Sequence, residues 1–338
     1  CKCFDELISE GYSFSPVELN GDDLAQILYT SGTTGKPKGC MITHNSIMLN
    51  GLLSALGMKL DEDARLLMAM PIWHASPLNN WFAAIQVVGG TMILMREYQP
   101  LEFLKTIQEE KCTMYFGAPI SYIVPLYLPE FDSFDLSSVN TWIYGGGPIS
   151  EDTAKMIMSK YKSDRFYQVY GMTETGPQGM MLQPKDQTRK PGSIGRVAIP
   201  GVHVKVMKTS TDQAGPGETG EIWLQSPCVM TGYLNDPEAT QDVFEGDGWY
   251  KSGDVARLDD DGYLFVVDRI RDMIITGSEN VYSKEVEDVI SACPGVVEVA
   301  VISIPHPSWG ETVGAVVVGS KEAALDEESI KTFLSDKL

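Results

Sequence analysis

The stretch from Tyr29 to Gly39 gathers residue types that bind phosphate. Glycines remove side chains where a backbone must approach a ligand closely. Hydroxyl groups and successive backbone N–H groups bind anions, and lysines add positive charge. The residues concerned are Ser31, Gly32, Thr33, Thr34, Gly35, Lys36, Lys38 and Gly39. The chemistry predicted for this loop is therefore phosphate binding.

The spacing shows which kind of phosphate loop this is. A nucleotide-binding P-loop needs the pattern G-x-x-x-x-G-K-[ST]. Here two residues separate Gly32 from Gly35, and Pro37 stands where the Ser or Thr should be. A solvated Ser/Thr/Gly turn would explain any three of these residues, but it explains the whole ordered string poorly. The string predicts a phosphate loop of another kind.

Two strands position this loop. The seven residues from Leu24 to Thr30 form an apolar, β-prone run, and Cys40 to Thr43 resume an apolar course after the loop. This pattern predicts a buried strand, a loop at its carboxyl end and a second strand leaving the loop.

Further polar motifs border predicted strands downstream: most of them follow a strand, and the motif 249–254 precedes a strand predicted over 255–258. The first is the segment 71–76, which contains Trp73 and His74; the others are 144–148, 170–176, 249–254 and 268–272. Alone, each has an ordinary structural explanation, such as a partly buried loop histidine or a tight turn. Where these segments contain glycines, a flat ligand can lie against the backbone, and where they contain carboxylates, a hard cation or a pair of hydroxyl groups can bind.

The ordered set of motifs, from about Leu24 to Ile304, resembles the adenylate-forming (AMP-binding) superfamily. Within it, the chain is similar to acyl- and aryl-CoA synthetases of the fatty-acid–CoA ligase type. The resemblance implies an AMP-forming acid–thiol ligase with ATP, Mg²⁺ and coenzyme A as cofactors. A fatty or aryl carboxylic acid would be activated to acyl-AMP with release of pyrophosphate, and the acyl group would then pass to coenzyme A.

The resemblance also implies residue roles. Catalytic roles fall to Thr30, Lys36, Thr173, Glu174 and Arg269, with Glu174 as the metal ligand. The nucleotide would contact Ser31, Gly32, Thr33, Thr34, Gly35, Lys38, Gly145, Gly146, Gly147, Pro148, Tyr170, Gly171, Met172, Asp254 and Arg269. The acid would contact Trp73, His74, Gly171 and Met172, and Arg271 falls at a hinge where Lys or Asp is usual.

Alternative functions stay open at this point. His74 occupies a place where amino-acid-activating relatives commonly carry an aspartate, which argues against an amino-acid substrate. One alternative is an adenylation enzyme that loads a carrier protein. Another is a non-catalytic nucleotide-binding relative, although intact Lys36, Glu174, Asp254 and Arg269 weigh against it.

The order of predicted elements favours an α/β protein with a parallel-sheet core, a β-rich subdomain and the start of a small α+β domain. We expect an α/β nucleotide- and acyl-binding subdomain over 1–191, a β-rich subdomain over 192–270 and a partial C-terminal domain over 271–338. Compared with the family, the chain is apparently truncated at both ends and lacks a lysine-bearing C-terminal segment. We therefore expect adenylation by this chain alone to be impaired.

Composition limits the classes of partner and the location that we expect for this chain. The 338 residues carry a net charge of −20, and no basic face for nucleic acid is visible. The six cysteines are scattered, which favours a cytoplasmic protein with free thiols. The longest apolar stretch, 81–95, is broken and too short to span a bilayer. The expected partners are the small carboxylic acid, ATP and coenzyme A, and the family admits a homodimer.

Overall fold

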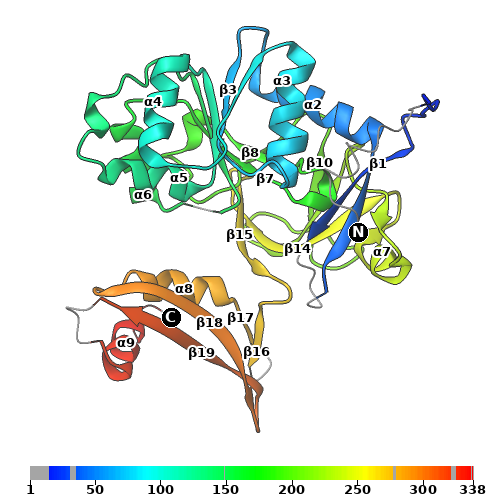
Figure 1. The fold of residues 1–338 in the computed structure, drawn as a ribbon. Coiled ribbons are helices and arrows are strands. Elements are labelled where there is room, and N and C mark those ends of the chain that lie inside the picture. Colours follow the sequence, from blue (N-terminus) through cyan, green and yellow to red (C-terminus); the bar gives the residue numbers. More distant parts are fainter. Residues whose placement is uncertain are drawn as a thin grey trace, which may run out of the picture.

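The computed structural model describes residues 15–30, 36–147, 149–276, 279–320, 325–335 and 337. Its strands form four sheets, and Figure 1 shows that the last of them belongs to a C-terminal unit below the rest of the chain. The largest sheet has seven strands in the order β4-β3-β5-β6-β7-β8-β9. The first five of these are parallel, and β8 and β9 are antiparallel, so the predicted parallel α/β core is confirmed.

The elements of this core alternate between strands and helices along the chain. The strands are β3 (Arg65–Met68), β4 (Thr91–Leu94), β5 (Met114–Gly117), β6 (Thr141–Gly145), β7 (Phe166–Tyr170), β8 (Met180–Leu182) and β9 (Val197–Ala198). The α-helices are α2 (His44–Met58), α3 (Ala83–Val88), α4 (Pro100–Glu110), α5 (Pro119–Ile123) and α6 (Glu151–Lys160). The segment η1 (Ser76–Phe82) is π-helical, and the short 3-10 turns are η2 (Val124–Tyr127), η3 (Phe131–Ser133), η4 (Thr173–Thr175) and η5 (Pro184–Asp186).

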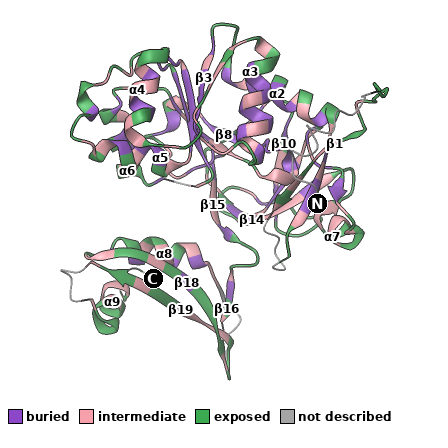
Figure 2. Ribbon diagram, in the orientation of Figure 1, coloured by how far each residue is buried: buried purple, intermediate pink, exposed green. Residues whose placement is uncertain are grey.

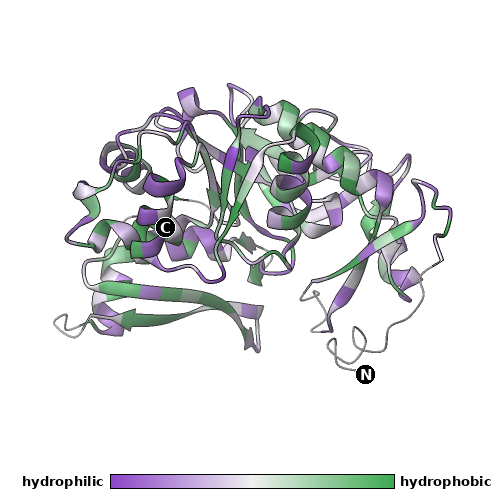
Figure 3. Cartoon of the chain, turned by 45° about the horizontal axis from the view of Figure 1, so that its top comes forward, coloured by the Kyte–Doolittle hydropathy of each residue, from purple (hydrophilic) through white to green (hydrophobic). Residues whose placement is uncertain are grey.

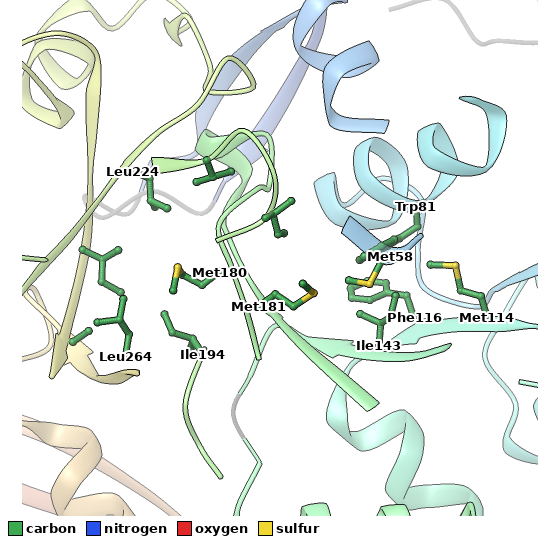
Figure 4. Packing of buried hydrophobic residues seen from close by; sticks show 14 of the residues in the cluster. Met58, Trp81, Met114, Phe116, Ile143, Met180, Met181, Ile194, Leu224 and Leu264 are labelled. Carbon is green, nitrogen blue, oxygen red and sulfur yellow. The ribbon is translucent and has the colours of Figure 1, made fainter. Parts of the chain in front are cut away.

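Successive residues of the parallel strands enter two different cores. On β5, Met114 and Phe116 join one cluster and Tyr115 joins the other. The first cluster includes residues of α2, η1 and α3, and the second includes residues of α4 and α6, so helices cover both faces of the sheet. Figure 4 shows that the first cluster continues past Met181 to Leu264 of the neighbouring β-rich sheet. The parallel sheet and the β-rich sheet are therefore packed around shared hydrophobic residues.

The strand before the phosphate loop differs from its prediction. β1 (Leu24–Thr30) has the predicted bounds and pairs antiparallel with β2 (Lys38–Thr43), which also pairs with β12 (Gly232–Tyr233). However, β1 is not buried: its side chains are exposed or half-buried, because it is the edge strand of this sheet (Figure 2). The buried strand is β2, whose Cys40 and Ile42 are fully enclosed.

The β-rich region forms a five-stranded antiparallel sheet. Its strands are β10 (His203–Met207), β11 (Thr219–Gln225), β13 (Phe244–Glu245), β14 (Trp249–Leu258) and β15 (Leu264–Arg269), and α7 (Pro237–Val243) precedes β13. A hairpin turn at Asp261-Gly262 joins β14 to β15, with Gly262 at a φ of +81°. Glycine adopts this left-handed conformation without the cost that a side chain would bring.

The C-terminal unit has a four-stranded sheet in the order β17-β16-β19-β18. The long hairpin of β18 and β19 is largely hydrophobic in Figure 3, and Ile302, Val316 and Val318 on it are exposed. The elements are β16 (Ile274–Thr276), β17 (Glu279–Val281), α8 (Ser283–Ser291), β18 (Val296–His306), β19 (Gly310–Gly319) and α9 (Glu327–Leu334). Within the described part of the chain, no helix has the length and apolar character needed to cross a membrane.

Candidate functional site

The Glu174 carboxylate connects β1, the strand before the phosphate-type loop, to the carboxyl end of the parallel sheet. β7 ends at Tyr170, and the helical turn η4 then carries Glu174. Its Oε1 accepts hydrogen bonds from the Thr30 hydroxyl, at 3.5 Å, and from the Tyr233 hydroxyl, at 3.1 Å. The fold thus brings together Thr30 and Glu174, which lie 144 positions apart in the sequence.

Local contacts hold the η4 turn in place. Gly176 ends the turn at a φ of +71°, and a Cβ there would lie 2.3 Å from the carbonyl oxygen of Cys228. The Thr175 hydroxyl donates to the Gln178 carbonyl at 2.7 Å, and the Met230 N–H donates to the Glu174 carbonyl at 2.8 Å. The backbone at Glu174 and at the two residues after it is therefore held by these contacts.

The charge of Glu174 influences the groups around it. Burial, reinforced by Glu174, raises the pKa values of the Cys40 thiol and of the Tyr233 and Tyr250 phenols above their ordinary values. These groups therefore stay protonated near neutral pH. Among the residues that the structure describes, no Lys or Arg forms an ion pair with Glu174; Lys38 Nζ instead lies 5.0 Å from the centre of the Tyr233 ring.

This arrangement suits a divalent cation bound jointly with phosphates. No three metal-binding side chains gather anywhere in the described ranges. Mg²⁺ does not require such a cluster, because it usually takes one or two carboxylates and completes its shell with water and substrate phosphates. A hard carboxylate without a cationic partner among the described residues fits that ion.

A second polar cluster centres on Asp254, which is 6% exposed. The Tyr170 hydroxyl donates to its Oδ2 at 2.7 Å, and the Arg269 Nε–H donates to its Oδ1 at 3.2 Å. Burial, together with the Asp254 charge, raises the pKa of Tyr170 well above its ordinary value, so the phenol remains a donor. The sequence predicted a strand beginning only at Val255, but β14 already begins at Trp249, and Asp254 lies within it.

The glycines near the carboxyl ends of β6 and β7 serve different purposes. A Cβ at Gly145 would lie 2.9 Å from the Val169 side chain, and one at Gly171 would lie 2.3 Å from the Pro177 carbonyl oxygen. These two glycines therefore permit close packing of the protein on itself. Gly146, at a φ of +81°, and Gly147 have open space around them, which leaves room for a ligand.

The structure leaves other predicted residues outside these two clusters. Trp73 is 74% exposed and lies with exposed His74 in the loop between β3 and η1. Lys36 is exposed, Met172 packs against two core clusters, and Arg271 forms an ion pair with Asp272 at 3.5 Å. Thr173 begins η4. Six predicted residues lie outside the described residues: Ser31, Gly32, Thr33, Thr34, Gly35 and Pro148.

Sequence reasoning missed Tyr233. This residue reaches Glu174 because β12, which contains Tyr233, pairs with β2 next to the phosphate-loop strand. β12 has only two residues, and its partner lies about 190 positions away, at Met41 and Cys40. Local sequence patterns hold no signal for so short and distant a pairing.

A parallel α/β sheet, a phosphate-type segment between two antiparallel strands, and carboxylate clusters around Glu174 and Asp254 are typical of a nucleotide-binding enzyme. Comparison with known families makes this specific. Residues 5–234 match the family described as "AMP-binding enzyme", and residues 285–338 match "AMP-binding enzyme C-terminal domain". The chain belongs to the AMP-binding enzyme family.

Individual relatives agree with this assignment. Feruloyl-CoA synthase of an Amycolatopsis species is 40% identical over 325 residues, covering 96% of this chain and 65% of the relative. The long-chain-fatty-acid–CoA ligase FadD13 of Mycobacterium tuberculosis is 35% identical, covering 93% of this chain and 61% of the relative. The structure of ATP-bound MatB from Rhodopseudomonas palustris matches with a TM-score of 0.86 at 35% identity, covering 96% of this chain and 64% of that structure. The chain thus spans less than two thirds of the length of these relatives.

Proposed function

We propose that the protein is an AMP-forming acid–thiol ligase. It activates a fatty or aryl carboxylic acid with ATP, giving acyl-AMP and pyrophosphate, and transfers the acyl group to coenzyme A. The observation that carries this proposal is the contact between Thr30, at the mouth of the phosphate-type loop, and Glu174, at the carboxyl end of the parallel sheet.

The described residues suit the first half-reaction through positioning and charge. Asp254, held by Tyr170 and Arg269, is a two-oxygen acceptor suited to the ribose hydroxyls. Thr30 and Thr173 offer hydroxyl donors near Glu174, and Lys36 adds positive charge beside the loop. Mg²⁺ at Glu174 would supply charge compensation for the phosphates. No side chain needs to act as a nucleophile, because the bound carboxylate attacks the α-phosphate itself.

The proposed acid is an aryl or an alkyl carboxylate. The relatives named above are a feruloyl-CoA synthase and a long-chain-fatty-acid–CoA ligase, which supports aryl and alkyl carboxylates alike. In the proposal, Trp73, His74, Gly171 and Met172 border the acid. Nearby in the sequence, Trp81 is 1% exposed and packs on Phe116 in the core, so it is not part of this proposed acid-binding set.

Coenzyme A is the proposed acceptor, with a carrier protein as the competing one. The second half-reaction would follow a rotation of the C-terminal unit about Arg271, two residues after the end of β15. Ser283 at the start of α8 donates to Asp268 at 3.0 Å, so this contact would have to open if the unit rotates. Supplying acid, ATP and either coenzyme A or a phosphopantetheinylated carrier protein, with mass spectrometry of the thioester, separates the two acceptors.

We also propose a cytoplasmic location and a homodimer. All four described cysteines (Cys40, Cys112, Cys228 and Cys293) are free and buried, which suits a reducing compartment.

On α2, the apolar side chains of Met48, Leu52 and Leu56 recur every four residues and are exposed, which offers an interface. Sedimentation of the wild type and of a Leu52→Glu, Leu56→Glu variant tests the dimer; an unchanged molecular mass would refute this interface.

The decisive test of the proposed function is stabilisation by non-hydrolysable acyl-adenylate analogues. The panel contains N-acylsulfamoyl adenosines with hydroxycinnamoyl, short, medium and long alkyl, and aminoacyl groups. We expect the aryl or an alkyl analogue to stabilise the folded chain by about 2.7 kcal/mol at ~100 times its Kd. Adenosine and the free acids serve as ligand controls, since neither joins both halves of the site.

Two other outcomes would contradict parts of the proposed function. Stabilisation by the aminoacyl analogue alone would overturn the proposed acid class. The absence of stabilisation by any analogue, in a sample shown by circular dichroism to be folded, would favour the non-catalytic nucleotide-binding alternative.

A further inference from the structure

β14 carries an irregularity immediately before Asp254. Lys251 pairs with Trp223 of β11, and Val255 pairs with Glu221. Residues 252–254 therefore lie opposite residue 222 alone, and Gly253 within this bulge has a φ of +74°. A bulge of this kind changes the direction of the strand and re-aims the side chains around it. Here the re-aimed side chain is Asp254, which reaches Tyr170 and Arg269.

The bulge is held by the side chain of Glu221. Its Oε1 accepts the Gly253 N–H at 2.8 Å, and its Oε2 accepts the Trp223 Nε1–H at 2.8 Å. The bulge would otherwise leave the Gly253 N–H without a ladder partner, and an unpaired backbone donor is costly. Each carboxylate oxygen thus has its own donor, one of which belongs to a 4% exposed tryptophan. Glu221 is therefore oriented by Trp223 and in turn fixes Gly253.

The opposite side of Gly253 faces the strand that leads to the hinge. The Gly253 carbonyl accepts the Ile270 N–H at 2.8 Å, and the Ser252 hydroxyl accepts the Asp254 N–H at 3.0 Å. Gly253 therefore lies between the Glu221 carboxylate and the backbone that connects Arg269 to Arg271. A displacement of this glycine would move Asp254 and its Arg269 partner together.

We propose that Glu221 is a positioning residue for Asp254, which determines how strongly the site selects a nucleotide with ribose hydroxyls. Glu221 does not touch the nucleotide; it acts by holding the bulge that aims the Asp254 carboxylate. This inference rests on the proposed function, because it takes Asp254 as the acceptor of those hydroxyls.

The test compares the affinities of MgATP and of its 2′,3′-dideoxy analogue, measured by calorimetry on the 338-residue chain. We expect Glu221→Ala to reduce the preference for MgATP by about tenfold, the effect of losing a hydrogen bond to a charged group. The dideoxy analogue, which cannot use Asp254, should bind the variant about as well as it binds the wild type. In a Glu221→Ala, Asp254→Ala double variant, the loss should be no greater than that of Asp254→Ala alone.

Glu218 provides a matched control. Its Oε2 accepts the Gly215 N–H at 2.7 Å, and its Oε1 binds Lys208 at 2.9 Å, so it also holds a glycine, here in the connection between β10 and β11. Glu218→Ala should leave the MgATP preference unchanged.

Glu221→Gln provides a second variant should Glu221→Ala fail to fold. Its amide oxygen can accept the Gly253 N–H, but its amide nitrogen turns a second donor toward Trp223, so a smaller loss is expected.

The outcomes separate this inference from the proposed function. If Glu221→Ala, or Glu221→Gln in its place, keeps the wild-type preference while Asp254→Ala loses it, the positioning role is wrong and the ribose role stands. If MgATP and the dideoxy analogue both bind the Glu221 variants more weakly by the same factor, Glu221 acts only on folding, and the positioning role is again overturned. If the wild type shows no preference between the two nucleotides, the assignment of Asp254 in the proposed function fails first.

Discussion

Glu174 and Asp254 both accept a hydrogen bond from a tyrosine, buried Tyr233 and half-buried Tyr170 respectively, yet their surroundings differ. Asp254 is 6% exposed and has an Arg269 partner at 3.2 Å in addition to Tyr170. Glu174 is half-buried, and its described donors are the hydroxyls of Thr30 and Tyr233. One carboxylate is neutralised by the chain itself, whereas the other has no cationic partner within the described residues.

The difference indicates which cluster forms independently of ligand. A buried carboxylate without compensation is expensive, so Asp254 needs its partners for folding. Under the proposed function, Glu174 would be hydrated while no nucleotide is bound and would exchange that water for a cation when ATP binds. We therefore expect Asp254 and its partners to influence stability, and Glu174 to influence ligand binding.

Glu174→Gln is expected to have the largest effect on binding. The amide keeps an acceptor for Thr30 and Tyr233 but loses the charge that the proposed Mg²⁺ site requires. We predict that the gain in ATP affinity produced by Mg²⁺ falls by about 100-fold, a typical loss when a group that stabilises phosphate charge is removed. Calorimetry with ATP in Mg²⁺ and in EDTA measures this gain directly. A variant that retains the full Mg²⁺ effect would remove Glu174 from the metal site.

The two tyrosines allow a matched test of stability. Tyr170→Phe removes the donor at 2.7 Å from enclosed Asp254, and we expect it to lower the free energy of unfolding by roughly 1–3 kcal/mol. Tyr233→Phe removes a 3.1 Å donor from Glu174, which water can reach, so the loss should be below about 1 kcal/mol. Urea unfolding of both variants gives the two values. Equal losses would contradict the contrast between the clusters.

The sequence predicted the parts of this contrast that depend on local pattern. The phosphate-type string and the segments around Glu174 and Asp254 have distinctive residue types, and strand–helix alternation predicted the parallel sheet. The contacts between these segments depend on tertiary pairing. Tyr233 reaches Glu174 through a two-residue strand, and Tyr170 reaches Asp254 across 84 positions.

Burial was harder to predict than strand position. The bounds of β1 were predicted correctly from its apolar run, but the same run suggested burial, and Tyr29 is 64% exposed. Alternation cannot reveal which strand of a small sheet lies at the edge, because that depends on which partner arrives from elsewhere in the chain. The bulge at Gly253 was similarly hidden: it depends on the register between β14 and β11, which lie about 30 residues apart in the sequence.

The smallest expected effect concerns alkaline pH. Burial and the Glu174 charge raise the pKa values of Cys40, Tyr233 and Tyr250, whereas burial and the Asp254 charge raise that of Tyr170. A raised pKa in the folded state favours the protonated form, so this stability is complete below the ordinary thiol pKa of 9.0 and is lost as pH rises further.

Removing either charge should make that loss shallower, and Glu174→Gln should do so more than Asp254→Asn, because Glu174 acts on three such groups and Asp254 on one. We expect the difference from wild type to be below about 1.4 kcal/mol, the equivalent of one pKa unit. Urea unfolding of the wild type and both variants at about pH 8 and about pH 10.5 measures it. If the loss of stability between these pH values is the same in all three proteins, Glu174 does not carry the uncompensated charge that distinguishes it from Asp254.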